Sequence, residues 1–190
     1  MTSPKGASPI ASNKPSARLP LVLASESPRR LALLAQAGIV PAAVRGASLD
    51  ETPKKHELPR EYAIRLARAK AEAVRASWQN GPALFLAADT VVACGRRILP
   101  KAENESEVRA CLALLSGRRH QVLTAIALAL PDGPVRERLV MTRVQFCRLG
   151  DAEIEAYART REGEGKAGGY AIQGRAEIFV RAINGSYSNV

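Results

Sequence analysis

Residues 21–30 read LVLASESPRR, and the rest of the chain is organised around this stretch. The short apolar run 21–24 contains Val and is bounded by Ser, which predicts a buried strand. Ser27, Pro28 and Gly38 suit the N-cap, the first position and the left-handed stop of a helix, so residues 28–37 are predicted to be helical. The stretch therefore predicts a strand, a tight turn and a helix.

Two arginines, Arg29 and Arg30, stand in the first turn of this helix. Free backbone N–H groups and the positive end of the helix dipole disfavour cations there. Because arginines are unfavourable at this position, we expect the pair to neutralise an anion, and phosphate is the obvious candidate. On the pair alone, two solvated arginines on a surface helix are an equally good interpretation.

Composition limits the classes of protein that the chain can represent. Its 190 residues, 46% of them hydrophobic, fit one globular domain or two closely joined lobes. The net charge of +10 suits a polyanionic partner, either nucleic acid, an acidic membrane or a phosphorylated small molecule. The three cysteines form no CxxC pair and there are only two histidines, which argues against structural zinc and fits a reducing cytoplasm. The apolar runs are too short to span a bilayer, so no membrane partner is expected.

Residues 1–18 are rich in Ser, Pro, Ala and Lys and have no apolar face. We predict a disordered tail over these residues and a folded domain over residues 19–190. The lack of acidic residues gives the tail a faint likeness to an organelle transit peptide, but a disordered bacterial extension is the favoured interpretation.

The remaining elements are predicted from apolar spacing, caps and turn residues. Helices are predicted over 59–78, from the capping box at 104–107 to 115, and over 152–159 with Asp151 as the cap. Strands are predicted over 39–46, 83–88, 90–94, 97–99, 121–130, 135–147 and 178–183. The glycine-rich loop 163–169 lacks the Walker pattern and is weak evidence of phosphate binding by itself.

Lys70 and Asp89 are the candidate site residues within these elements. On the helix over 59–78, Tyr62 and Leu66 begin an apolar stripe, and Lys70 lies beside it. The Lys70 side chain therefore either snorkels along this face or points into a site. Asp89 directly follows the apolar run 83–88, and open α/β sheets bind ligands at the carboxyl ends of such strands. The alternative is an aspartate that caps a loop. Glu51 lies in a polar loop, where the usual interpretation of a carboxylate is a solvated charge.

Five blocks of sequence together resemble the Maf family, whose members have also been named septum formation inhibitors. They are ASESPRR at 24–30, ADTVV at 88–92, LSGRRHQVLT at 115–124, KAGGYAIQG at 166–174 and INGSYSNV at 183–190, in the family's order. The resemblance implies a cytoplasmic nucleoside triphosphate pyrophosphatase that cleaves between the α and β phosphates with a divalent metal, Mg²⁺ or Mn²⁺. It also implies a mixed α/β fold with a twisted sheet and two lobes around a central cleft, like that of the inosine triphosphate pyrophosphatases.

The family's functional positions can be carried over where this sequence matches them. The resemblance assigns substrate binding to Ser25, Arg29, Arg30, Thr90 and Gln173, catalysis to Asp89, Lys70 and Lys101, and metal binding to Asp89 and Glu51. The family pattern usually has other residues at Ala102 and Ala125. It normally continues beyond the position of Val190 with a VGLPL-type segment and a helix, so we expect the sheet to lack one packing partner.

Three functions stay open on the sequence. Arg29 and Arg30 directly after Pro28, the DTVV block and the KAGGYAIQG block resemble the branch that acts on dTTP and UTP, and a preference for 7-methyl-GTP is the enzymatic alternative. The competing class is a non-enzymatic basic regulator of cell division that binds nucleotide or nucleic acid. Aromatic residues make up only 4% of the chain and no nucleic-acid motif is present, so no specific nucleic-acid partner is expected. A homodimer is compatible with the sequence.

Overall fold

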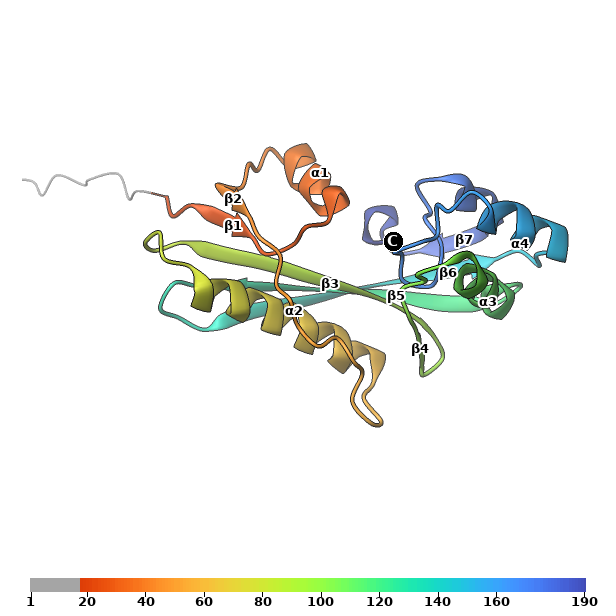
Figure 1. Ribbon diagram of the computed structural model, residues 1–190, viewed down its shortest axis with the longest axis horizontal. Coiled ribbons are helices and arrows are strands. Elements are labelled where there is room, and N and C mark those ends of the chain that lie inside the picture. The colour runs from red at the N-terminus through yellow and green to blue at the C-terminus, as the bar shows by residue number, and fades with distance from the viewer. Residues whose placement is uncertain (1–17) are drawn as a thin grey trace, which may run out of the picture.

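The computed structural model describes residues 18–190 (Figure 1). The tail predicted over residues 1–18 lies outside the described residues, except for Arg18, which is exposed. The described elements are β1 (Leu21–Leu23), α1 (Pro28–Gln36), β2 (Ala43–Val44), α2 (Pro59–Ser77), β3 (Leu84–Cys94), β4 (Arg97–Leu99), α3 (Glu105–Leu115), β5 (Arg119–Ala129), β6 (Val135–Phe146), α4 (Asp151–Ala158), the 3₁₀ helix η1 (Arg175–Phe179), β7 (Val180–Asn184) and the 3₁₀ helix η2 (Tyr187–Asn189).

The described strands form one seven-stranded mixed sheet in the order β2-β1-β3-β5-β6-β7, with β4 paired to β3 beside this path. β1 pairs in parallel with both β2 and β3, and the other pairs are antiparallel. The long strands β3, β5 and β6 run through the molecule and connect its two halves (Figure 1). The predicted mixed α/β fold is therefore confirmed.

Helix α2 covers one face of the sheet and forms the first core. Its buried stripe runs through Ala63, Leu66, Ala67, Lys70, Ala71 and Val74. Small residues on both sides, such as Ala87 and Ala127 of the sheet, bring the helix close to the strands. Lys70 therefore lies within the buried stripe and not at its border, because the stripe is shifted from the one expected through Tyr62 and Leu66. α1 lies on the opposite face of the sheet from α2 (Figure 1).

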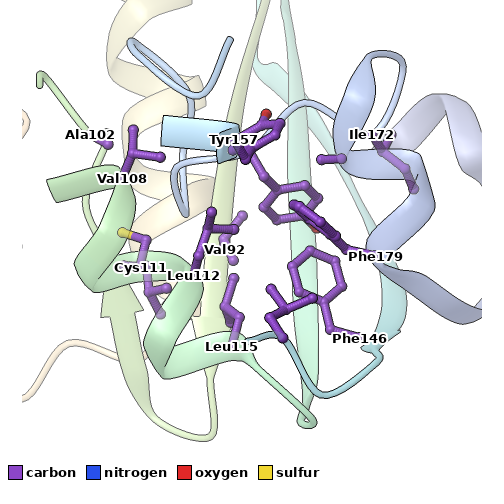
Figure 2. Close-up of a cluster of buried hydrophobic side chains, with 14 of the residues drawn as sticks. Val92, Ala102, Val108, Cys111, Leu112, Leu115, Phe146, Tyr157, Ile172 and Phe179 are labelled. Atoms are coloured by element: carbon purple, nitrogen blue, oxygen red, sulfur yellow. The ribbon is translucent and has the colours of Figure 1, made fainter. Parts of the chain in front are cut away.

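The second core lies at the other end of the long strands, where α3, α4 and the segment after α4 pack on β5 and β6. Phe146, Tyr157, Tyr170 and Phe179 meet edge to face, with ring centroids 5.0 to 6.2 Å apart. Figure 2 shows Phe146, Tyr157 and Phe179 beside the apolar side chains of α3. We call the half built on α2 the first lobe and the half built on α3 and α4 the second lobe. The expected two-lobed arrangement is present.

Several predicted boundaries are wrong. The strand expected over 39–46 is reduced to the two residues of β2, and Val40 is 86% exposed because no neighbouring strand covers it. The strand expected to end at residue 88 continues without a break to Cys94, so Asp89 lies inside β3 and not at a strand end. Its partner on the neighbouring strand β5 is Ala125, whose small side chain leaves room for the carboxylate.

Two elements begin at other residues than expected. Ile178 belongs to η1, so β7 starts at Val180, and Gly150 takes the N-cap position of α4, with Asp151 as the first helical residue. Ser27 takes the N-cap position of α1 as predicted, but its side chain makes no capping hydrogen bond. Gly38 does adopt the expected left-handed conformation, with φ +70°. In the part of the chain that the structure describes, no helix is long and apolar enough to cross a membrane.

Candidate active site

A cleft between the two lobes gathers the residues that the family resemblance singled out. It consists of two adjoining cavities of about 500 and 480 Å³. The residues that line both are Asp89, Thr90, Lys101 and Ala167. Arg29, Arg30 and Lys70 line the larger cavity, and Glu51 lines the smaller one. Ser25 and Gln173 line neither, but each bonds an arginine of the cleft.

An ion network with a buried Lys70–Asp89 pair occupies the centre of this cleft. The Nζ of Lys70 lies 2.6 Å from Oδ1 of Asp89 and 2.6 Å from Oε1 of Glu51. The Nζ of Lys101 lies 2.9 Å from Oε2 of Glu51. Lys70 and Asp89 are only 8% and 4% exposed, so the lysine does not snorkel to solvent. Helix α2 and strand β3 position this pair, because both residues belong to rows that face each other across the first core.

Burial and neighbouring charges shift the pKa values of Asp89 and Glu51 in opposite directions. Burial raises the pKa of Asp89 above its usual value, and the charge and hydrogen bond of Lys70 oppose this effect only in part. Burial alone would also raise the pKa of Glu51, but hydrogen bonds from Lys70 and Lys101 and their charges together outweigh it and lower that pKa. The Asp89 carboxylate is thus more basic than an ordinary aspartate, which suits a group that accepts a proton.

Arg30 is held by hydroxyl groups. Its Nη1 donates to Oγ of Ser25 at 3.0 Å and its Nη2 to Oγ1 of Thr90 at 3.4 Å. Thr90 Oγ1 also lies 3.0 Å from Oγ1 of Thr124. Burial lowers the pKa of Arg30, and the charge of Asp89 opposes this effect. The arrangement orients a half-buried guanidinium without neutralising it.

Arg29 is held by oxygen atoms of the second lobe. Its Nη1 donates to Oε1 of Gln173 at 3.1 Å and to the carbonyl oxygen of Val190 at 2.9 Å. Burial also lowers the pKa of Arg29. Within residues 18–190 neither Arg29 nor Arg30 forms a salt bridge with a carboxylate. Both charges therefore remain available to an anion in the cleft.

The glycine-rich loop 163–169 positions Lys101 and adds a cation that the sequence analysis missed. Lys101 pairs with Ala167 in a β-bridge, and Ala102 N donates to the carbonyl oxygen of Lys166 at 3.1 Å. Lys166 lines the larger cavity. Its place beside Lys101 depends on contacts between segments more than 60 residues apart in sequence, so local spacing could not reveal it. Tyr62 also lines the smaller cavity, whereas the sequence places it only on an apolar stripe.

Asp89 and Glu51 are the carboxylates that could bind the implied divalent cation. Residues 18–190 contain no group of three or more His, Cys, Asp or Glu side chains that could hold a metal. Asp89 and Glu51 do contact the same ammonium group, so their oxygens lie close together. Mg²⁺ is typically held by one or two carboxylates together with substrate phosphates. The donor set therefore fits Mg²⁺ or Mn²⁺ that binds together with a polyphosphate.

The comparisons with curated proteins and with family models agree with the resemblance seen in the sequence. Among solved structures, a HAM1 protein from Coxiella burnetii aligns with 70% of this chain and 75% of its own, at 20% identity and a TM-score of 0.47. The dTTP/UTP pyrophosphatase of Paramagnetospirillum magneticum is 60% identical over 170 residues, which cover 90% of this chain and 88% of that protein. The dTTP/UTP pyrophosphatase of Rhodopseudomonas palustris strain HaA2 is 59% identical over 174 residues, 90% and 84% of the two chains. The family model described as Maf-like protein matches residues 20–190, and the chain therefore belongs to the Maf family.

Proposed function

We propose that the cleft hydrolyses nucleoside triphosphates, with dTTP and UTP as preferred substrates, to the nucleoside monophosphate and pyrophosphate. The observation that carries this proposal is the gathering of Arg29, Arg30, Lys101 and Lys166 around a buried Asp89–Lys70 pair in one cleft. Relatives that are named dTTP/UTP pyrophosphatases are 60% and 59% identical to this chain over the aligned residues, which supports the nucleotide preference. The cysteines of the described chain are free, so we place the reaction in the cytoplasm.

The unpaired cations bind the substrate. A triphosphate carries about four negative charges, and Arg29, Arg30 and Lys166 can bind it without first losing a carboxylate partner. Ser25 and Thr90 hold the guanidinium of Arg30 in place, and Gln173 does the same for Arg29. The N-terminus of α1 adds its dipole at the same corner.

Asp89 accepts a proton from the attacking water. Burial raises its pKa, which makes it a better base than an exposed aspartate, and Lys70 keeps it in the charged form that can take the proton. Lys70 and Lys101 stabilise the negative charge that moves onto the leaving pyrophosphate. Asp89 and Glu51 would hold Mg²⁺ or Mn²⁺, which when bound polarises phosphate oxygens as a Lewis acid.

A panel of nucleotides tests this proposal. Pyrophosphate release is measured with Mg²⁺ and with Mn²⁺ for dTTP, UTP, the other common triphosphates and 7-methyl-GTP. We expect the highest kcat/KM for dTTP and UTP. A clear preference for 7-methyl-GTP would contradict the proposed substrate, and a lack of turnover across the panel would contradict the enzyme itself.

A further inference from the structure

The position of the Glu51 carboxylate is fixed although its segment has no regular secondary structure. Residues 45–58, between β2 and α2, form neither helix nor strand. The Glu51 carboxylate nevertheless meets two lysines, Lys70 at 2.6 Å and Lys101 at 2.9 Å. A segment without strand or helix hydrogen bonds samples many backbone conformations unless other groups fix it. Some side chain must therefore anchor the main chain at Glu51.

Tyr62 provides this anchor from the first turns of α2. Its hydroxyl donates a hydrogen bond to the carbonyl oxygen of Glu51 at 2.6 Å. Tyr62 precedes Lys70 by eight residues, so the two side chains emerge on neighbouring sides of the same helix. One helix therefore holds both ends of Glu51, the main chain through Tyr62 and the carboxylate through Lys70.

Arg65 fixes the phenol and the residue after Glu51. Its guanidinium lies 5.4 Å from the centroid of the Tyr62 ring. Its Nη2 donates to the carbonyl oxygen of Thr52 at 3.2 Å, and Glu57 binds the same guanidinium through both carboxylate oxygens at 2.6 and 2.7 Å. The Tyr62 hydroxyl is thus presented by a supported ring to a segment that is tied down beside it.

We infer that Tyr62 is a positioning residue for Glu51, whose main chain it fixes so that the carboxylate points into the cleft where the divalent cation and the polyphosphate bind. This inference rests on the proposed function, because it gives the Glu51 carboxylate its ligand. The Tyr62 hydroxyl is the donor of this hydrogen bond, because the carbonyl oxygen of Glu51 can only accept.

The decisive variant is Tyr62→Phe, which removes the hydroxyl and keeps the ring that Arg65 covers. Mn²⁺ binding is measured by electron paramagnetic resonance, with a dTTP analogue that carries a methylene group between its α and β phosphorus atoms. We expect about tenfold weaker Mn²⁺ binding, the usual effect of removing a group that orients a metal ligand. In turnover assays with dTTP, the Mn²⁺ concentration for half-saturation rises by a similar factor and kcat at saturating Mn²⁺ falls less.

Arg75→Met is the matched control on the same helix. Arg75 also donates to loop carbonyl groups, those of Leu130 at 3.1 Å and Gly133 at 2.9 Å, but at the far end of α2 from the cleft. This variant loses a comparable tertiary contact and is expected to bind Mn²⁺ as the wild type does. Equal Mn²⁺ affinity in Tyr62→Phe and Arg75→Met would overturn the inference.

A double variant tests whether Tyr62 acts through Glu51. Glu51→Gln is expected to weaken Mn²⁺ binding, and adding Tyr62→Phe to it should cause no further loss, because the group that Tyr62 positions is already gone. Full additivity, or an unchanged Mn²⁺ affinity in Glu51→Gln, would also overturn the inference. A wild-type protein that hydrolyses no triphosphate would instead contradict the proposed function, so the two failures are distinguishable.

Discussion

At Asp89 a carboxylate lies inside a buried strand, and a lysine from the facing helix compensates its charge. Asp89→Asn keeps the shape of the side chain but removes its charge and most of its basicity. We expect kcat for dTTP to fall by roughly 10²-fold or more, the loss typical of a general base or a main electrostatic group. Steady-state pyrophosphate release measures this, with Asp132→Asn in the exposed β5–β6 turn as the control. Near-wild-type turnover would remove Asp89 from the mechanism.

The same residue sets the acid side of the pH profile. Burial raises the pKa of Asp89, so kcat/KM should already decline at a pH above the ordinary aspartate pKa of 3.8 as the pH falls. Lys70 lowers this pKa and Glu51 raises it. Lys70→Gln should therefore move the decline to higher pH and Glu51→Gln to lower pH. Profiles that shift together, or do not shift, would show that another group controls this limb.

At the scale of elements, the sequence predicts best where local chemistry decides. The α2 boundaries, the Asn104 cap of α3 and the turn between β5 and β6 follow from residues within a few positions of each end. The predicted strand end at residue 88 is wrong, because a charged residue usually terminates an apolar strand. The partner that allows Asp89 to stay within β3 is Lys70, 19 residues away on α2. The anchoring role of Tyr62 could not be predicted either, because a tyrosine on a helical stripe is typical of a core residue.

The glycine-rich loop owes its path to close packing on β3. Gly168 has φ +72°, and a Cβ at this position would lie 2.8 Å from Cγ1 of Val92. Gly165 has φ +69° with no atom within 4 Å of its would-be Cβ. Gly165→Ala should thus cost about 1 kcal/mol through backbone strain, and Gly168→Ala a further 1–3 kcal/mol or so through the clash. Urea unfolding of both variants measures the difference, and equal free energies of unfolding would show that Val92 yields freely.

At the scale of the whole molecule, a buried histidine in the second core makes the stability of the fold depend on pH. His120 packs edge to face against Phe146 and Tyr170, with Nε2 2.8 Å from the Tyr170 hydroxyl and no partner for Nδ1 in the described chain. Burial lowers its pKa from 6.5 to about 4. The unfolded chain therefore takes up a proton between pH 6.5 and 4 that the folded chain does not.

This difference predicts how the stability of the molecule depends on pH. His120 contributes roughly 3 kcal/mol to the free energy of unfolding above pH 6.5. This contribution is lost as the pH falls toward 4. Free energies of unfolding measured across this range for the wild type and His120→Gln should converge at low pH, because the glutamine does not titrate. Parallel curves would show that His120 is not the group responsible.

The central claim, that one cation-lined cleft between the lobes splits a triphosphate between its α and β phosphates, is tested most directly by its products. ³¹P nuclear magnetic resonance of dTTP incubated with the protein and Mg²⁺ distinguishes every phosphate species. We predict the resonances of dTMP and pyrophosphate in equal amounts from the first turnovers. The appearance of dTDP with orthophosphate, or unchanged dTTP, would contradict the claim.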